Sequence, residues 1–129
     1  MSDETKLGGL LLSDDLIFTS RITGEARTIG MTIRAARSVE ILKNLAKAEM
    51  PSLLMIDLSN PGLIIEELLS WIKSMSADKP IRVVAYGSHV NVGTLKAARA
   101  AGCDEVMPRS QFIERLPKQL NEWATARNV

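Results

Sequence analysis

The sequence predicts one α/β domain built on a mostly parallel sheet with helices on both faces. Short apolar runs recur along the 129 residues, and the stretches between them are long enough for helices. The runs at 53–56 and 81–84 are nearly continuous in apolar character, which is typical of strands covered on both faces. With 46% hydrophobic residues, a chain of this length buries a substantial core as a single domain.

Five strands and five helices follow from this spacing. We expect strands at 10–12, 31–35, 53–56, 81–85 and 106–107. Gly30 is expected to end the first helix. Ser38 is a candidate N-cap for the second helix, which carries an apolar stripe after it. The third helix is predicted from about Gly62 to Met75.

The last two helices are predicted from capping residues and from a proline. Asn91 caps the fourth helix, and Gly102 ends it in the left-handed conformation. Pro117 lies inside the apolar pattern of the last helix, where proline removes a donor and clashes with the preceding turn. We therefore expect a short turn from about Ser110 to Arg115 and a helix proper over 116–126. The domain then covers 1–129, with its core at about 7–126.

Composition argues against several classes of function, namely nucleic-acid binding, membrane binding and zinc binding. The net charge of +1 gives no field strong enough to recruit nucleic acid or an anionic membrane. The single cysteine, Cys103, has no disulfide partner, and no Cys/His cluster is present that holds zinc. No apolar run is long enough for a signal peptide or a membrane span. We expect a cytoplasmic protein that binds neither nucleic acid nor membrane.

Charged side chains follow several of the predicted strands. In an open parallel α/β sheet, ligands bind outside the carboxyl ends of the strands. Ser13, Asp14 and Asp15 follow the first strand, Asp57 follows the third, and Arg109 follows the fifth. Three carboxylates and one cation are therefore expected to converge at one edge of the sheet.

Such a cluster predicts a divalent metal, because like charges brought together repel unless a cation neutralises them. Magnesium accepts one or two carboxylates and keeps its other positions for water, carbonyls and phosphate oxygens. Asp14, Asp57 and the backbone carbonyl of Ser59 suit that arrangement. The loop after the first strand is acidic and lacks glycine, which argues against a flavin or nucleotide site.

Three stretches of the sequence resemble the receiver domains of response regulators. Leu10–Asp15 (LLLSDD) is similar to the first strand and acidic pair of that family. Met55–Pro61 (MIDLSNP) is similar to its phosphoacceptor segment, including the proline four residues after the aspartate. Ala98–Arg109 (ARAAGCDEVMPR) resembles the helix, glycine turn and strand that deliver its basic residue. The resemblance runs from about Leu10 to Trp123 and implies a flavodoxin-like sheet of order 2-1-3-4-5.

The resemblance also implies roles for individual residues. Asp57 would accept a phosphoryl group from a histidine kinase or phosphotransfer protein. Asp14 would hold magnesium, while Ser13 or Asp15 takes the place of the other acidic residue. Such a protein is not an enzyme apart from its own phosphorylation by a phosphodonor. It would act on a downstream protein partner or as a homodimer through the fourth helix, fifth strand and fifth helix.

The sequence departs from the family pattern around this site. Receivers place a Thr or Ser hydroxyl at the end of the fourth strand, where Ala85 stands here, and Ser88 is the nearest hydroxyl. Arg109 replaces the family's lysine and follows Pro108, whereas the family's lysine precedes a proline. Val106 occupies the aromatic switch position. These departures predict an atypical receiver, or pseudo-receiver.

The leading hypothesis is a stand-alone atypical receiver that signals by binding proteins, with phosphorylation at Asp57. The alternatives are a phosphorylation-independent interaction module and a small metal-dependent flavodoxin-like protein that binds or converts a ligand. Plainer interpretations also exist for single residues. Asp57 is a candidate cap for its own loop, Asp15 for the first helix, and Arg109 is a candidate solvated cation. Trp71 lies out of phase with its helix and is a candidate exposed anchor for a partner.

Overall fold

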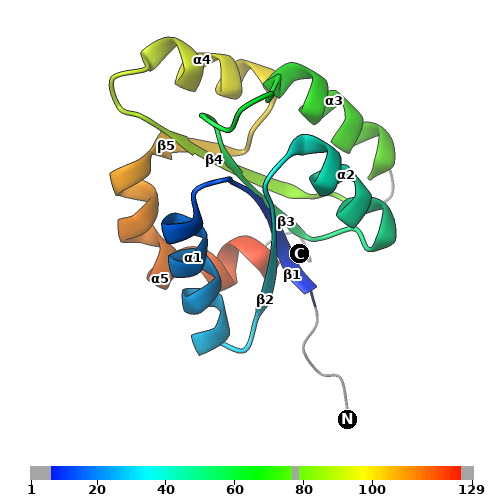
Figure 1. Ribbon diagram of the computed structural model, residues 1–129, viewed down its shortest axis with the longest axis vertical. Helices are drawn as coiled ribbons and strands as arrows, with labels where there is room; N and C mark the ends of the chain where they lie inside the picture. Colours follow the sequence, from blue (N-terminus) through cyan, green and yellow to red (C-terminus); the bar gives the residue numbers. More distant parts are fainter. Residues whose placement is uncertain (1–6, 77–78, 126–129) are drawn as a thin grey trace.

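The structure, a computed structural model, describes residues 7–76 and 79–125. Five parallel strands form a sheet between two layers of helices (Figure 1). The strands are β1 (Leu7–Leu12), β2 (Thr32–Ala36), β3 (Leu53–Asp57), β4 (Arg82–Gly87) and β5 (Glu105–Pro108). The helices are α1 (Leu16–Thr28), α2 (Val39–Ala48), α3 (Ile65–Met75), α4 (Val92–Ala101) and α5 (Arg109–Thr125).

The strand order is β2-β1-β3-β4-β5, with all pairs parallel, which confirms the predicted flavodoxin-like topology. All five residues of β3, the central strand, are buried, as its continuous apolar run predicted. Helices α1 and α5 cover one face of the sheet, and α2, α3 and α4 cover the other (Figure 1). The chain reverses its strand order at β1 and β3, so ligands are expected at the carboxyl ends of these two strands.

Alternation along the strands divides the buried residues into two cores. One core, here called the α1/α5 core, includes Leu11, Met55, Tyr86, Phe112 and Trp123. The second, here called the α2–α4 core, takes the neighbouring strand residues, among them Leu12, Ile56 and Ala85. Because successive side chains of a strand point to opposite faces, the core that a strand residue joins tells which face it occupies.

Four predicted helix ends are confirmed by the structure. The Ser38 hydroxyl accepts a hydrogen bond from the backbone N–H of Ile41, and the Asn91 side chain accepts one from Thr94. Gly102 ends α4 with φ of 110°, and Gly30 follows α1 with φ of 73°. The start of α3 was predicted too early, because the chain from Gly62, whose φ is 79°, makes a turn before the helix begins at Ile65.

The prediction that Pro117 interrupts the last helix is wrong. Helix α5 runs without a break from Arg109 to Thr125 and contains Pro117 in its interior. Proline cannot donate to the carbonyl one turn earlier, but it is exposed here and the buried face on both sides of it is continuous. Burial of that face outweighs the local cost. Ala126, the predicted end of the helix and of the core, lies outside the described residues.

Two further expectations are corrected. Strand β4 ends at Gly87, not at Ala85, and Ala85 is fully buried beside Ile56 within the sheet. Trp71 is half-buried against the α2–α4 core, and the ammonium group of Lys43 lies 5.3 Å from the centre of its ring. Contact with Lys43 places this indole against its own protein, so Trp71 is not the exposed anchor that helical phase alone suggested.

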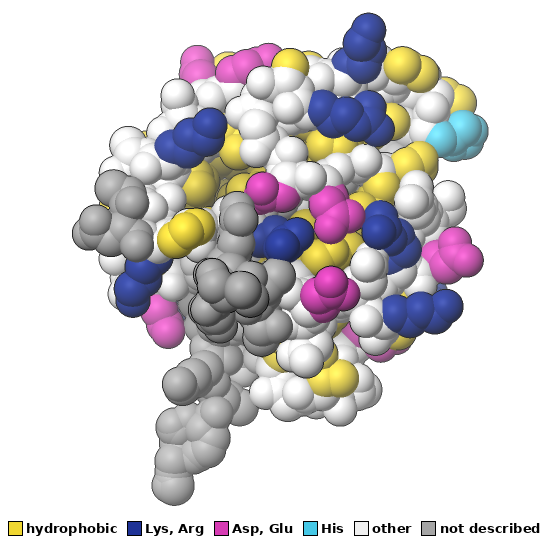
Figure 2. Space-filling model, turned by 180° about the vertical axis from the view of Figure 1, so that it is seen from behind, with side chains coloured by type: hydrophobic (Ala, Val, Ile, Leu, Met, Phe, Trp, Pro, Cys, Tyr) yellow, Lys and Arg dark blue, Asp and Glu magenta, His cyan; other side chains and the backbone are white. Residues whose placement is uncertain are grey.

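Charges are mixed over the surface seen from behind (Figure 2). Lys and Arg side chains lie among Asp and Glu side chains on this face, and the described residues form no patch of one sign there. Some of these charges are paired: Glu105 lies 3.6 Å from Arg82 and 3.2 Å from Arg115. Within residues 7–76 and 79–125, every helix is too short or too polar to cross a membrane.

Candidate functional site

Asp57 is the last residue of β3 and lies at the carboxyl edge of the sheet. Its neighbours in register are set by the two adjacent strands: Ile56 pairs with Leu12 of β1, and Asp57 itself pairs with Tyr86 of β4. The residue is 3% exposed. A buried carboxylate requires hydrogen bonds or a cation, so the groups around Asp57 define the site.

The loop after Asp57 folds back onto its carboxylate. Oδ1 accepts hydrogen bonds from the backbone N–H of Ser59 at 2.9 Å and from the Ser59 hydroxyl at 2.7 Å. The N–H of Asn60 also donates to the Asp57 carbonyl, which closes a turn. The plainer interpretation, that Asp57 caps its own loop, is therefore correct for Oδ1. Oδ2 accepts no hydrogen bond from any described residue.

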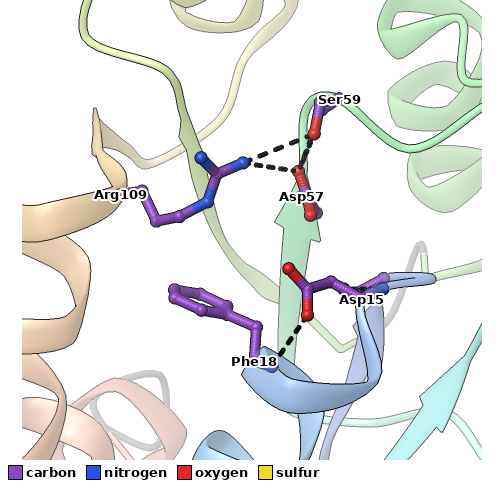
Figure 3. Close-up of polar contacts among 6 residues, drawn as sticks. Asp15, Phe18, Asp57, Ser59 and Arg109 are labelled. Carbon is purple, nitrogen blue, oxygen red and sulfur yellow. Dashed lines mark hydrogen bonds and ion pairs between the residues drawn. The ribbon is translucent and has the colours of Figure 1, made fainter.

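Arg109 brings a cation to the same carboxylate. It is the first residue of α5, and β5 precedes it directly, so its side chain starts beside the edge of the sheet. Its Nη2 lies 3.6 Å from Oδ1 of Asp57 and 3.4 Å from the Ser59 hydroxyl oxygen (Figure 3). The side chain is 38% exposed, but its contact with Oδ1 makes Arg109 a partner of Asp57 and not a purely solvated cation. Pro108 ends the edge strand β5, where its missing N–H is tolerated.

Aromatic rings support the guanidinium of Arg109 from below. Its central carbon lies 5.7 Å from the centre of the Phe18 ring and 5.9 Å from that of Tyr86. Phe18 is on α1 and lies under the guanidinium in Figure 3. The Tyr86 ring packs against Phe18 and Phe112, with centre-to-centre distances of 5.0 and 4.4 Å, and the Phe18 and Phe112 rings are 6.2 Å apart. This stack holds the cation over the site and separates it from bulk water on one side.

The loop after β1 places its three polar residues in different surroundings. Ser13 is 1% exposed, and its hydroxyl oxygen accepts a hydrogen bond from the N–H of Asp15. Asp15 turns its carboxylate to the N-terminus of α1, where Oδ1 accepts from the N–H of Phe18 at 3.0 Å (Figure 3). Asp14 is exposed. The capping interpretation of Asp15 is therefore correct for Oδ1, and its role as a metal residue stays a prediction.

The predicted convergence of three carboxylates is therefore wrong. No group of three or more His, Cys, Asp or Glu in the described part of the chain is placed to hold a metal ion. Asp57 and Asp14 nevertheless keep carboxylate oxygens that accept no hydrogen bond from described residues. Magnesium often takes only one or two carboxylates and completes its shell with water. This donor set fits magnesium in that mode and does not form an all-protein cage.

The other predicted positions lie around the site without contacting Asp57. The Ser88 hydroxyl oxygen accepts a hydrogen bond from the N–H of Val90, so it serves its own loop. Ser88 and Arg109 line the same open pocket, together with Phe18 and Pro108. Val106 is half-buried against the α2–α4 core. The role of the Ser59 carbonyl as a metal ligand stays a prediction.

Three contacts at this site were missed in the sequence. They are the Ser59 hydroxyl on Asp57, the Phe18 ring beneath Arg109, and the placement of Tyr86 beside Asp57. The placement of Tyr86 could have been predicted from the sequence. If β4 continues to Gly87, alternation puts Tyr86 on the α1/α5 face, level with Asp57. Burial first, and then the negative charge of Asp57, raise the pKa of Tyr86 well above its ordinary value.

Comparison with solved structures finds the same fold in proteins of low sequence identity. The receiver domain of NtrX from Brucella abortus is 22% identical, with a TM-score of 0.77, and the match covers 92% of this chain and 98% of that one. The receiver domain of the Francisella response regulator 1452 is 16% identical, with a TM-score of 0.75, over 92% and 96% of the two chains.

Two other matches show how the domain occurs in longer chains. An NtrX chain crystallised with ADP is 19% identical at a TM-score of 0.76, and this chain spans 26% of its length. A response regulator from Burkholderia pseudomallei, crystallised with a phosphorylated aspartic acid, a calcium ion and citrate, is 17% identical at a TM-score of 0.70, over 91% of this chain and 70% of that one. No family model and no curated protein sequence matches the chain. The chain therefore has the fold of the receiver domains of response regulators.

Proposed function

We propose that this chain is an atypical receiver domain in two-component signal transduction, and that Asp57 is its phosphoacceptor. The observation that carries the proposal is the environment of the Asp57 carboxylate. It is buried at the carboxyl end of the central strand, with Arg109 and the Ser59 hydroxyl on Oδ1 and no described hydrogen-bond donor on Oδ2. One oxygen is thus held in place while the other remains available as a nucleophile.

The reaction is a transfer of a phosphoryl group to Oδ2. A lone pair of Oδ2 forms the new P–O bond as the P–N bond of a phosphohistidine, or the P–O bond of a small acyl phosphate, breaks. The leaving imidazole or carboxylate keeps the bonding electrons, and Asp57 becomes an acyl phosphate. Negative charge gathers on the three peripheral oxygens of the phosphoryl group, so positioned cations and donors lower the barrier.

Arg109 is the cation that this chain itself supplies. Its guanidinium lies between Asp57 and the aromatic pair, and it offers several N–H donors to oxygens of the transferred group. Asp14 and Asp57 would hold a magnesium ion largely through water. When bound, that ion supplies further charge neutralisation at the phosphoryl oxygens.

Incubation with acetyl phosphate and Mg²⁺, followed by intact-mass measurement, tests this proposal. We expect a gain of one phosphoryl group that hydroxylamine removes, because an acyl phosphate is reactive toward that nucleophile. Asp57→Asn abolishes the gain. Asp15→Asn, which changes a neighbouring carboxylate that caps α1, preserves it.

A phosphorylation-independent interaction module is the second candidate, and one observation favours it. The end of β4 offers no hydroxyl at either Ala85 or Gly87, and the Ser88 hydroxyl serves its own loop. If wild-type protein gains no phosphoryl group with either acetyl phosphate or a phosphorylated phosphotransfer protein, this second function replaces the first.

The partners of the domain remain proposals. A histidine kinase or phosphotransfer protein would supply the phosphoryl group, and a downstream protein would read the result. A homodimer through α4, β5 and α5 would bury the surface that carries the Arg82, Glu105 and Arg115 ion pairs. We propose a signalling role and not an enzymatic one. A cytoplasmic location and independence from an attached output domain both stay predictions.

A further inference from the structure

Tyr86 lies beside Asp57 on the same face of the sheet. The two residues are direct partners in the parallel register between β3 and β4. Met55, two residues before Asp57, belongs to the α1/α5 core, as does Tyr86. By alternation the Asp57 side chain therefore leaves the sheet on the face that Tyr86 occupies. Adjacent strands are only about 4.8 Å apart, so a side chain as long as tyrosine has the reach to meet a group carried by Asp57.

The Tyr86 hydroxyl is buried without a hydrogen-bond partner. The residue is fully buried, and no residue in 7–76 or 79–125 meets hydrogen-bond geometry at its oxygen, although the Ser13 side chain lies near enough to act on the tyrosine pKa. Buried hydroxyls are nearly always satisfied, because an unmade hydrogen bond costs about 1–3 kcal/mol. The ring cannot easily turn away, since Phe18 and Phe112 pack against it at 5.0 and 4.4 Å. The hydroxyl is therefore held ready for a group that the protein alone does not provide.

The Tyr86 hydroxyl keeps its proton and is therefore able to donate a hydrogen bond to a ligand. Burial and the nearby carboxylate of Asp57 favour the neutral phenol, while Ser13 and Arg109 oppose this effect more weakly. The strand register and the 5.9 Å distance from the Arg109 guanidinium to the Tyr86 ring place this side chain beside Asp57 and Arg109. A neutral phenol at this place offers one proton to an anionic oxygen.

A second donor near the first is also unused. The Nε of Arg109 is buried and makes no hydrogen bond with the described residues. The same guanidinium contacts the Tyr86 ring at 5.9 Å and the Asp57 carboxylate at 3.6 Å. Two unpartnered donors, one neutral and one cationic, therefore flank Asp57.

We propose that the Tyr86 hydroxyl donates a hydrogen bond to the tetrahedral oxyanion that Asp57 carries, and so replaces the hydroxyl that β4 lacks at its end. This inference rests on the proposed function, because Asp57 must carry the oxyanion. It assigns a binding role to a residue that composition would class as packing. It also explains how a site with Ala85 and Gly87 at β4 retains a neutral donor.

The chain offers a clean spectroscopic probe, because Tyr86 is its only tyrosine. Protein labelled with ¹³Cζ-tyrosine gives one ¹³C resonance that reports hydrogen bonding at the phenol oxygen. Beryllofluoride, a stable mimic of a phosphoryl group on a carboxylate, is titrated in the presence of Mg²⁺. Its binding is followed independently by ¹⁹F NMR in wild type, Tyr86→Phe and Asp57→Asn.

We expect beryllofluoride to shift the tyrosine resonance in wild type and not in Asp57→Asn. Tyr86→Phe should bind beryllofluoride roughly 10- to 100-fold more weakly, which is the usual effect of losing a hydrogen bond to a charged group. Its denaturation midpoint should stay close to that of wild type, because no described residue makes a hydrogen bond of good geometry with the lost hydroxyl. The control Thr19→Val removes another unpartnered buried hydroxyl, on α1, and should bind like wild type.

The remaining outcomes separate the two proposals. If beryllofluoride binds wild type and Tyr86→Phe equally and leaves the tyrosine resonance unmoved, the role of Tyr86 is overturned while Asp57 stands as phosphoacceptor. If wild type shows neither bound fluorine resonances nor a phosphoryl adduct with acetyl phosphate, both proposals are overturned together.

Discussion

The two oxygens of Asp57 differ in what they contact, and this difference is the central property of the site. Oδ1 is fixed by Ser59 and faces Arg109, so it is neutralised and oriented. Oδ2 lacks such contacts among the described residues, and Tyr86 lies on the adjacent strand. A buried carboxylate with one constrained and one open oxygen is suited to nucleophilic attack, because its orientation costs little further entropy.

Tyr86 should resist ionisation while the protein is folded. Its folded-state pKa is raised above the ordinary value near 10, so folded and unfolded chains are both protonated below pH 10 and stability there is unaffected. Above pH 10 the unfolded chain loses the proton first, and stability falls by up to about 1.4 kcal/mol per pH unit until the folded-state pKa is reached. Tyrosinate absorbance should therefore stay flat through pH 10 while circular dichroism shows native protein.

Asp57→Asn gives the matched comparison for this titration. Removing the negative charge should bring tyrosinate formation to lower pH, although burial alone still keeps the tyrosine pKa raised. A folded wild-type protein whose tyrosine ionises near pH 10 would contradict the buried position of the hydroxyl.

At the residue scale, sequence reasoning located Asp57 and Arg109 but not their surroundings. The proline spacing after Asp57 and the glycine turn before Arg109 are local features, so they are readable in sequence. The Ser59 hydroxyl contact depends on how one turn closes, and the Phe18 contact depends on how α1 packs against α5. Asp15 was ambiguous because the same carboxylate suits a helix cap and a metal ion, and only the helix start at Leu16 decides between them.

At the scale of elements, helix ends fix the loops that carry the site. Asp15 caps α1 and Ser38 caps α2, each by accepting from the N–H three residues on. The cap at Asp15 occupies one oxygen of that carboxylate, Oδ1, and so orients the side chain at the start of α1. Helix α5 begins at Arg109 itself, so the position of the cation depends on where that helix starts.

Asp15→Ala should lower the free energy of unfolding by about 1 kcal/mol, the usual effect of losing an N-cap. Ser38→Ala is the matched control, because it removes the equivalent cap from α2 without changing a carboxylate. Urea denaturation measures both changes. Magnesium affinity should be unchanged in Asp15→Ala and weakened in Asp14→Ala, so a loss of magnesium binding in the first variant would show that Asp15 is a ligand.

Element boundaries were predicted well where a local cap defines them and poorly where packing does. Gly102 and Asn91 are local signals, and both are where the sequence placed them. Pro117 is a local signal too, but the apolar face formed by Phe112, Leu116 and Leu120 is buried against the sheet and carries the helix through the proline. The end of β4 had no clear local signal, since Tyr86 favours a strand and Gly87 disfavours one.

At the scale of the whole molecule, one sheet separates two cores, and this arrangement explains why the fold was predictable. Continuous apolar strands require a helical layer on each face, and right-handed crossovers leave few strand orders. The site lies where that strand order reverses, at the carboxyl edge of the sheet, which both helical layers border. A change at Asp57 is therefore positioned to affect both layers, provided that they fold as one unit.

The two tryptophans test whether the layers are one cooperative unit. Trp123 belongs to the α1/α5 core, and Trp71 packs against the α2–α4 core. In Trp71→Phe, fluorescence reports the first core, and in Trp123→Phe it reports the second. A chain of 129 residues that folds as one domain should show, within each variant, a fluorescence transition in urea that coincides with loss of circular dichroism.

Trp123→Phe should be the less stable of the two variants, because Trp123 is fully buried and its indole N–H donates to Glu105 at 3.1 Å. Each variant is therefore compared only with its own circular dichroism curve. If fluorescence and circular dichroism separate in either variant, one helical layer melts before the other. In that case the two sides of the sheet would be distinct folding units, and a signal at Asp57 would have to reach each layer independently.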